Sequence, residues 1–109
     1  MIRGLGIDVI EVSRIDEAMQ NPRFLERILT PYERKEGLNA QSAAGRWAAK
    51  EAIAKAVGTH LKWQDVEVHK NGEGVPQPRI LPDGVQGKVH LSISHERGIA
   101  AAVAIWESD

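Results

Sequence analysis

An alanine-rich stretch in the middle of the chain predicts one long and thin helix. Residues 40–57 contain no proline and are followed by Gly58, and glycine is the residue that most often ends a helix in a left-handed conformation. Within this stretch Ala48, Ala52 and Ala56 recur at helical spacing and form a narrow apolar face. Because alanine side chains are short, we expect this helix to lie close against a sheet.

Strand patterns on both sides of the helix favour an antiparallel sheet. They occupy residues 2–12, 63–70, 74–80, 88–95 and 99–106. A tight turn is expected at 71–72, and the short segment 96–98 predicts a hairpin between the last two strands. Pro76 and Pro78 restrict their strand to a sheet edge. Since strands and helices do not alternate strictly, we predict an α+β fold, with an antiparallel sheet packed against one long helix and shorter helices, and with residues 1–109 forming a single domain.

Short helices are predicted between the first strand and the long helix. Ser13 is a candidate N-cap for a helix that runs to about Gln20, and Asn21-Pro22 ends it. Apolar residues at helical spacing predict a second helix over residues 24–29, and Pro31 suits the first position of a third.

Composition excludes several classes of function. The chain of 109 residues has no cysteine, which removes disulfides, thiolate nucleophiles and cysteine-ligated zinc. Its 14 Lys and Arg residues balance 15 Asp and Glu residues, whereas non-specific binding of nucleic acid needs an excess of cations. No apolar run approaches the roughly 18 residues of a membrane span, and the N-terminus lacks the apolar stretch of a signal peptide. We therefore predict a cytoplasmic protein that binds neither nucleic acid nor membranes.

Asp8 is a carboxylate within an apolar strand pattern. Side chains alternate along a strand, so Asp8 shares a face with Gly6 and Ile10. An ionised carboxylate in such surroundings is costly unless it has a cation or hydrogen-bond donors. Two interpretations follow: Asp8 accepts backbone hydrogen bonds at the end of the strand, or it is a metal ligand.

Glu51 lies among cations in the predicted long helix. At 100° per residue, Trp47, Glu51 and Lys55 share one side of the helix, and Arg46 and Lys50 share another. The spacing of Glu51 and Lys55 is that of an ordinary solvated salt bridge. The alternative is a site for a phosphate chain and a divalent metal, because carboxylate oxygens suit Mg²⁺ and the cations suit phosphate.

Ser94 and His95 close the strand that precedes the predicted hairpin turn. They are either surface residues or donors to a phosphate group. The four histidines have no metal-ligand spacing, and the sequence contains no GxxxxGK[ST], GxGxxG or GxSxG motif.

Four segments in this order resemble the holo-[acyl-carrier-protein] synthases, the small trimeric branch of the 4'-phosphopantetheinyl transferases. They are GLGIDVIEVSRI, GRWAAKEAIAKAVG, DVEVHKNGEGVP and VHLSISHERGIAAAVAIWE. The resemblance spans essentially the whole chain. It implies the transfer of 4'-phosphopantetheine from coenzyme A to a serine of an apo-acyl carrier protein in fatty acid biosynthesis. It further implies a homotrimer and the release of adenosine 3',5'-bisphosphate.

The resemblance also implies roles for residues of the first two segments. Asp8 matches the aspartate of the family's GID motif and Glu51 the glutamate of its KEA motif, so both would hold Mg²⁺. Lys55, Lys50 and Arg46 match basic positions near the phosphates of coenzyme A. We expect Lys55 to offset charge on the leaving bisphosphate, and Glu51 is the candidate base for the serine hydroxyl.

Further implied roles concern coenzyme A and the carrier protein. Ser94 and His95 match a pair that meets the 3'-phosphate or adenosine end from an adjacent subunit. The residues expected to face the carrier protein are Arg14, Arg23, Phe24 and Arg27. In one departure, Val75 stands where relatives often have a lysine that could contact a phosphate, and Arg79 is a candidate replacement.

Two other functions are compatible with the same residues. One is a different Mg²⁺-dependent phosphate or nucleotide enzyme that uses Asp8 and Glu51, which would not need Arg14 and the helix of Phe24 as a docking surface. The other is a non-catalytic binding module in which Asp8 and Glu51 are structural carboxylates.

Overall fold

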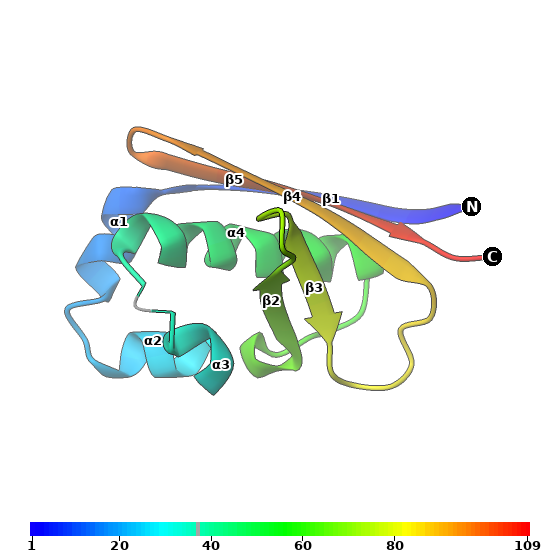
Figure 1. The fold of residues 1–109 in the computed structure, drawn as a ribbon, viewed down its shortest axis with the longest axis horizontal. Coiled ribbons are helices and arrows are strands. Elements are labelled where there is room, and N and C mark those ends of the chain that lie inside the picture. Colours follow the sequence, from blue (N-terminus) through cyan, green and yellow to red (C-terminus); the bar gives the residue numbers. More distant parts are fainter. Residues whose placement is uncertain (37) are drawn as a thin grey trace.

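Helix α4 (Ala40–Val57) runs through the centre of the molecule in the computed structural model, which describes residues 1–36 and 38–109 (Figure 1). The side chain of Asn39 accepts a hydrogen bond from the Ser42 amide at 2.8 Å and so begins the helix. Gly58, with φ of 71°, ends it. The predicted helix is confirmed at both ends. No helix among the described residues has the length and apolar character needed to cross a membrane.

A three-stranded antiparallel sheet covers one side of α4 (Figure 1). Its order is β1 (Ile2–Glu11), β5 (Ile99–Glu107) and β4 (Lys88–Glu96), so β5 is central and the other two strands are edges. The predicted hairpin between β4 and β5 is confirmed, and Gly98 in its turn has a φ of 71°. The α+β fold that the sequence predicted is therefore the fold observed.

A second sheet has two strands among the described residues, β2 (Val66–Lys70) and β3 (Pro76–Ile80), and lies beside α4 with β3 in contact with β4 of the larger sheet (Figure 1). The side chain of Asn71 shapes the hairpin turn by accepting hydrogen bonds from two backbone amides of the turn, at 2.8 and 3.0 Å. The strand predicted from Trp63 was wrong at its start. Trp63–Asp65 is a 3₁₀ turn because the Asp65 carboxylate accepts from the Lys62 amide at 2.8 Å, which competes with an extended backbone.

In the part of the chain that the structure describes, three short helices precede α4: α1 (Val12–Ala18), α2 (Arg23–Ile28) and α3 (Pro31–Arg34). The predicted cap at Ser13 was wrong. Helix α1 follows β1 without a break, and its first amide, of Val12, donates to the Gly98 carbonyl at 2.8 Å, so tertiary contact replaces the side-chain cap. The start of α3 is as predicted, and Thr30 caps it.

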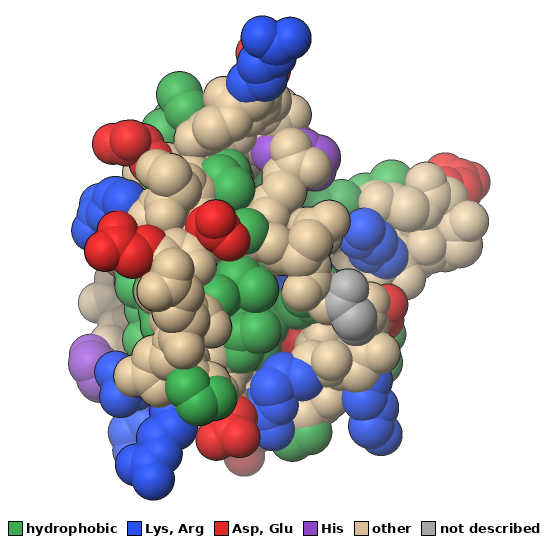
Figure 2. All heavy atoms as spheres, turned by 90° about the vertical axis from the view of Figure 1, so that its left-hand side faces the viewer, with side chains coloured by type: hydrophobic (Ala, Val, Ile, Leu, Met, Phe, Trp, Pro, Cys, Tyr) green, Lys and Arg blue, Asp and Glu red, His purple; other side chains and the backbone are tan. Residues whose placement is uncertain are grey.

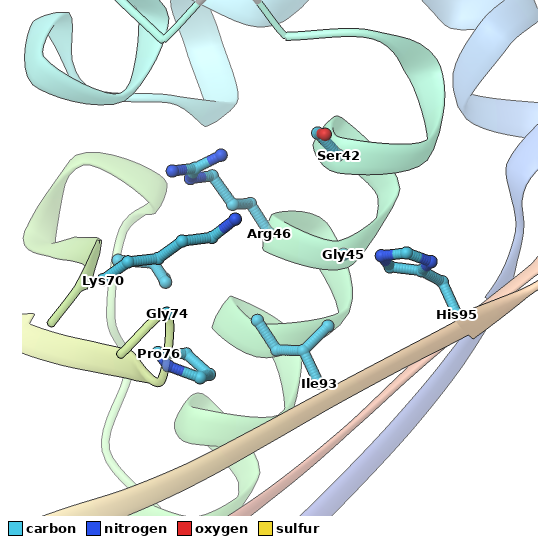
Figure 3. A pocket seen from close by; sticks show the side chains of 9 residues that line it. Ser42, Gly45, Arg46, Lys70, Gly74, Pro76, Ile93 and His95 are labelled. Atoms are coloured by element: carbon cyan, nitrogen blue, oxygen red, sulfur yellow. The ribbon is translucent and has the colours of Figure 1, made fainter. Parts of the chain in front are cut away.

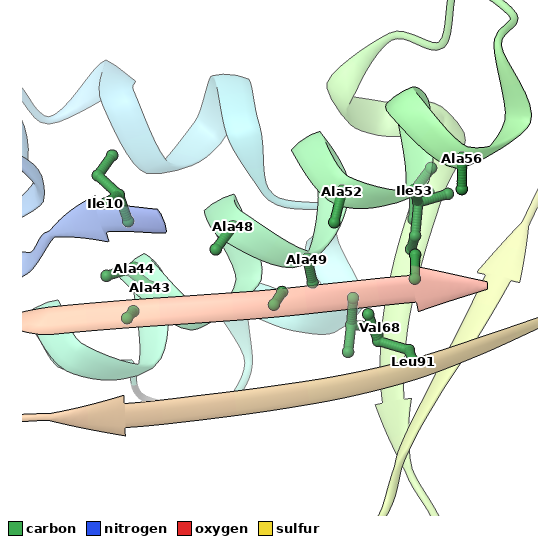
Figure 4. Close-up of a cluster of buried hydrophobic side chains, with 14 of the residues drawn as sticks. Ile10, Ala43, Ala44, Ala48, Ala49, Ala52, Ile53, Ala56, Val68 and Leu91 are labelled. Carbon is green, nitrogen blue, oxygen red and sulfur yellow. The ribbon is translucent and has the colours of Figure 1, made fainter. Parts of the chain in front are cut away.

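The core lies between α4 and the three-stranded sheet, and small side chains fill it (Figure 4). Ala48, Ala52 and Ala56 are at most 4% exposed. Strand β1 contributes Gly4 and Gly6, where an added Cβ would lie 1.7 Å and 1.9 Å from carbonyl oxygens of α4. The backbones of β1 and α4 are thus in direct contact. This contact sets the position of β1 relative to α4.

Candidate functional site

Asp8 shares a face of β1 with Gly6 and Ile10, as the alternation predicted, and this face packs on α4. Its neighbours on that face, Gly6 and Ile10, are buried, whereas Ile7 and Val9 on the outer face are each 59% exposed. The Asp8 side chain is 16% exposed, and its Oδ1 lies 3.4 Å from Nζ of Lys55 on α4. A cation therefore balances the carboxylate that the sequence left unpaired.

Lys55 pairs with one of the two candidate carboxylates. Its Nζ donates to the carbonyl of Ile7 at 3.0 Å and pairs with Asp8, not with Glu51. The structure thus does not show the ordinary Glu51–Lys55 salt bridge of the alternative interpretation. Glu51 lies one helical turn before Lys55, is half-buried, and lines an open cavity of about 280 Å³ with Trp63.

The donor set of this region fits Mg²⁺. Asp8 and Glu51 offer carboxylate oxygens, and no group of three or more His, Cys, Asp or Glu side chains among residues 1–36 and 38–109 is placed to hold a metal. Mg²⁺ is commonly bound by one or two carboxylates and completes its coordination with water and phosphate oxygens.

A second cavity, which we call the basic pocket, lies between α4, the β2–β3 hairpin and β4 (Figure 3). It has a volume of about 180 Å³. Arg46 and Lys70 point toward one another across it, His95 enters from β4, and Pro76 and Ile93 form an apolar wall (Figure 3). Two permanent cations and an imidazole beside an apolar wall are suited to an anionic group attached to a ring.

Lys50 does not contribute to the basic pocket, contrary to its expected place near phosphates. It is 4% exposed, and Nζ donates to the Ile28 carbonyl at 2.7 Å, the Trp63 carbonyl at 2.9 Å and Oε1 of Glu33 at 2.6 Å. An ammonium has three donors, so these bonds leave none for a ligand. Burial lowers the pKa of Lys50, and the hydrogen bond and charge of Glu33 act in the opposite direction. Lys50 is a structural anchor.

Glu33 is the residue that sequence reasoning missed. Its carboxylate is completely buried and accepts hydrogen bonds from the amides of Thr30 and Val68, both at 2.9 Å, in addition to the bond from Lys50. Its Oε2 also lies 3.6 Å from Nε of Arg46. The only signal in the sequence was the spacing of Thr30 and Glu33, which is that of a helix capping box and does not point to α4.

Ser94 and His95 lie on different faces of β4, because successive side chains of a strand alternate. Both residues line a cavity of about 260 Å³ on the hairpin, and His95 also lines the basic pocket, which Ser94 does not. Within this chain the pair therefore shares the hairpin cavity, but only His95 reaches the basic pocket.

The replacement expected for the lysine absent at position 75 is also corrected. Arg79 pairs across β2–β3 with Glu67 and does not line the basic pocket. Lys70, at the end of β2, supplies the additional cation there. The register of β2 and β3 determines which cation lines the pocket. It places Lys70 opposite Pro76, which also lines the pocket.

The expected docking residues lie mostly together. Arg14, Phe24 and Arg27 line one open depression between α1 and α2, whereas Arg23 is not among its lining residues. Phe24 also stacks on Trp47 of α4, with ring centroids 5.9 Å apart. Figure 2 looks onto this end of the molecule, where Lys and Arg side chains lie near exposed hydrophobic ones, with Asp and Glu side chains among them.

Known proteins share both the sequence and the fold of this chain. The family model of the 4'-phosphopantetheinyl transferase superfamily matches residues 4–104. The holo-[acyl-carrier-protein] synthase of Shouchella clausii is 42% identical, with 99% of this chain and 100% of the relative covered. A crystal structure of the Bacillus anthracis synthase in complex with CoA (3',5'-ADP) superposes with a TM-score of 0.90 at 41% identity, covering 100% of this chain and 99% of that one. A Helicobacter pylori synthase in complex with coenzyme A has a TM-score of 0.84 at 30% identity, covering 94% and 99%. The chain belongs to the 4'-phosphopantetheinyl transferase superfamily, among relatives of the holo-[acyl-carrier-protein] synthases.

Proposed function

We propose that this protein transfers 4'-phosphopantetheine from coenzyme A to a serine of an apo-acyl carrier protein and releases adenosine 3',5'-bisphosphate, with residues 1–109 acting as one domain. The observation that carries the proposal is the Asp8–Lys55 pair, 3.4 Å apart, set one helical turn from Glu51. The relatives named above act on acyl carrier proteins by name, and two of them are described in complex with CoA. Since such carriers serve fatty acid synthesis, we place the activity in the cytoplasm.

The proposed chemistry is phosphoryl transfer, which depends on positioning and charge neutralisation. Asp8 and Glu51 would hold Mg²⁺, which when bound supplies neutralising charge for a pyrophosphate. The serine oxygen forms a bond to the β-phosphorus, the bond from that phosphorus to the bridging oxygen breaks, and its electron pair stays with the bisphosphate. Glu51 accepts the serine proton, and Lys55, whose side chain is 55% exposed, donates toward the leaving group.

The two halves of the proposed site lie at opposite edges of the sheet, which supports an oligomer. Asp8 is on β1 and His95 is on β4, with β5 between these strands, which lie about 10 Å apart, and the register sets His95 two residues along the sheet from Asp8. The outer face of β1 is also apolar, with Leu5, Ile7 and Val9 at 66%, 59% and 59% exposed. A homotrimer, closed by three head-to-tail contacts, would bring the basic pocket of one copy to the carboxylates of the next.

A charge on the outer face of β1 is expected to separate the subunits and to reduce transfer. We expect Leu5→Glu to give a folded monomer whose transfer rate is lower by about tenfold or more, because the phosphate contacts of the neighbouring copy are lost. Light scattering coupled to size-exclusion chromatography measures the mass, and the transfer assay measures the rate. Leu81→Glu is the control, since Leu81 is 51% exposed outside the strands. A verified monomer with unchanged activity contradicts the shared site.

Charge reversal in the depression between α1 and α2 is expected to weaken carrier docking selectively. For Arg14→Glu we expect the KM for the carrier protein to rise about tenfold while the KM for coenzyme A stays unchanged, because like charges would meet an acidic partner. Lys35→Glu, a charge reversal outside the depression, is the control. Equal effects of both variants, or a change in the KM for coenzyme A alone, would count against docking at this surface.

Mass spectrometry of the carrier tests the function directly. The purified protein is incubated with coenzyme A and apo-acyl carrier protein, with Mg²⁺ or with a chelator. We expect the carrier to gain the mass of one phosphopantetheine only when Mg²⁺ is present. Breakdown of coenzyme A without modification of the carrier would indicate a phosphate hydrolase. Mg²⁺-dependent binding of coenzyme A without any reaction would indicate a binding module.

A further inference from the structure

Glu33 is a fully buried carboxylate that the proposed chemistry does not use. We propose that Glu33 is a positioning residue that holds the Arg46 guanidinium in the wall of the basic pocket, where Arg46 meets an anionic phosphate of the ligand; this inference rests on the proposed function. Three observations carry it: the partners of the carboxylate, the charge balance around it, and the elements that it joins.

Every partner of the Glu33 carboxylate is a donor. Oε1 accepts from the Thr30 amide at 2.9 Å and from Lys50 Nζ at 2.6 Å, and Oε2 accepts from the Val68 amide at 2.9 Å. Arg46 Nε is the remaining neighbour, 3.6 Å from Oε2. A carboxylate has enough lone pairs for all of them, whereas an amide would turn a donor toward other donors.

Glu33 is the carboxylate that directly contacts the two buried cations of the cluster, and Glu67 on β2 is a further carboxylate whose charge acts on Lys50. Glu33 faces two cations, Lys50 and Arg46, which are 4% and 7% exposed. Lys50 is satisfied by its three hydrogen bonds, but Nε of Arg46 is buried without a hydrogen-bond partner among the described residues. Glu67 acts on Lys50, so Arg46 is the buried cation whose hydrogen bonding is incomplete, and the basic pocket is the side from which an anion can reach it.

Glu33 also connects the walls of the basic pocket. Its hydrogen bonds reach the start of α3, the middle of α4 and strand β2. Val68 on β2 lines the pocket, and Lys70 follows two residues later, facing Arg46 across the pocket (Figure 3). One carboxylate therefore determines where Arg46 stands relative to Lys70.

Positioning and plain electrostatics predict opposite results for the removal of this charge. Without the carboxylate the pocket becomes more positive, and on charge alone an anion would bind more tightly. If Glu33 acts by positioning, Arg46 loses its orientation and the anion binds more weakly. The sign of the change in affinity therefore separates the two roles.

Calorimetric titration with adenosine 3',5'-bisphosphate provides the test. We expect Glu33→Gln to weaken binding about tenfold in the folded protein, and Arg46→Ala to weaken it by at least as much. Because Glu33 acts through Arg46, the double variant should bind no more weakly than Arg46→Ala. The matched control is Glu26→Gln, which removes an exposed carboxylate on α2 that does not line the pocket and should leave affinity unchanged.

A second measurement does not depend on the folding of Glu33→Gln. In NMR spectra of the unmutated protein, the Nε–H of Arg46, assigned by its loss in Arg46→Ala, should exchange slowly with solvent and shift on addition of the bisphosphate. Two results would overturn the role of Glu33 and leave the proposed function intact. One is an Arg46 Nε–H that exchanges with solvent as fast as those of exposed arginines. The other is an affinity for the bisphosphate that is unchanged or increased in Glu33→Gln while Arg46→Ala binds weakly. Absence of bisphosphate binding to the unmutated protein would instead overturn the proposed function, and this inference with it.

Discussion

Replacement of Glu51 by glutamine is expected to lower kcat about a thousandfold while the KM for the carrier protein stays unchanged. Glutamine keeps the shape of the side chain but loses the negative charge, so it neither accepts the serine proton nor binds a dication as a carboxylate does. Docking of the carrier would depend on the depression between α1 and α2, which does not include Glu51. The measurement is the steady-state transfer rate at varied carrier concentration.

Glu36→Gln is the control for this experiment, because Glu36 is an exposed carboxylate beyond α3. It should leave both constants unchanged. If Glu51→Gln retains a turnover near that of the unmutated protein, Glu51 is neither the base nor a required metal ligand, and Lys55 and Asp8 would have to perform the chemistry without it.

The largest expected effect on stability comes from a single methyl group at Gly6. The Cβ of Gly6→Ala would lie 1.9 Å from the carbonyl oxygen of Ala52, and this oxygen belongs to the backbone of α4 and cannot rotate away. Strand and helix must separate, so we expect a loss of about 3 kcal/mol or more in the free energy of unfolding. This corresponds to a decrease of roughly 15 °C in Tm for a domain of this size.

Thermal unfolding followed by circular dichroism measures the effect of Gly6→Ala. Gly72→Ala is the matched control, since an added Cβ there meets nothing within 4 Å, and its Tm should change little. A Tm of Gly6→Ala close to that of the unmutated protein would show that β1 and α4 are not held at the separation described above.

Local patterns predicted most of the fold. Helix α4 was predicted at both ends because alanine content, the absence of proline and Gly58 act within the helix itself. The faces of β1 followed from strand alternation, which correctly placed Asp8 on one face with Gly6 and Ile10. The errors at Ser13 and Trp63 arose where a distant backbone bond or a nearby side chain replaced the local preference.

The candidate site was less predictable because its key contacts join distant segments. Lys50 and Glu33 are 17 residues apart and meet only because α3 packs beside α4 and β2, so no spacing rule identifies their ion pair. Likewise, the choice of Lys70 over Arg79 depends on the register of β2 and β3. Helical spacing did separate Arg46 and Lys50 from Lys55, and in the structure the first two face Glu33 whereas Lys55 faces Asp8.

A crystal structure of the protein with coenzyme A and Mg²⁺ tests the central claim most directly, that Asp8 and Glu51 bind one dication. We predict a single octahedral ion with one oxygen of each carboxylate at about 2.0–2.1 Å and with the remaining positions filled by water and pyrophosphate oxygens. An ion bound away from either carboxylate, or the two carboxylates directed into separate regions with coenzyme A in place, would contradict it.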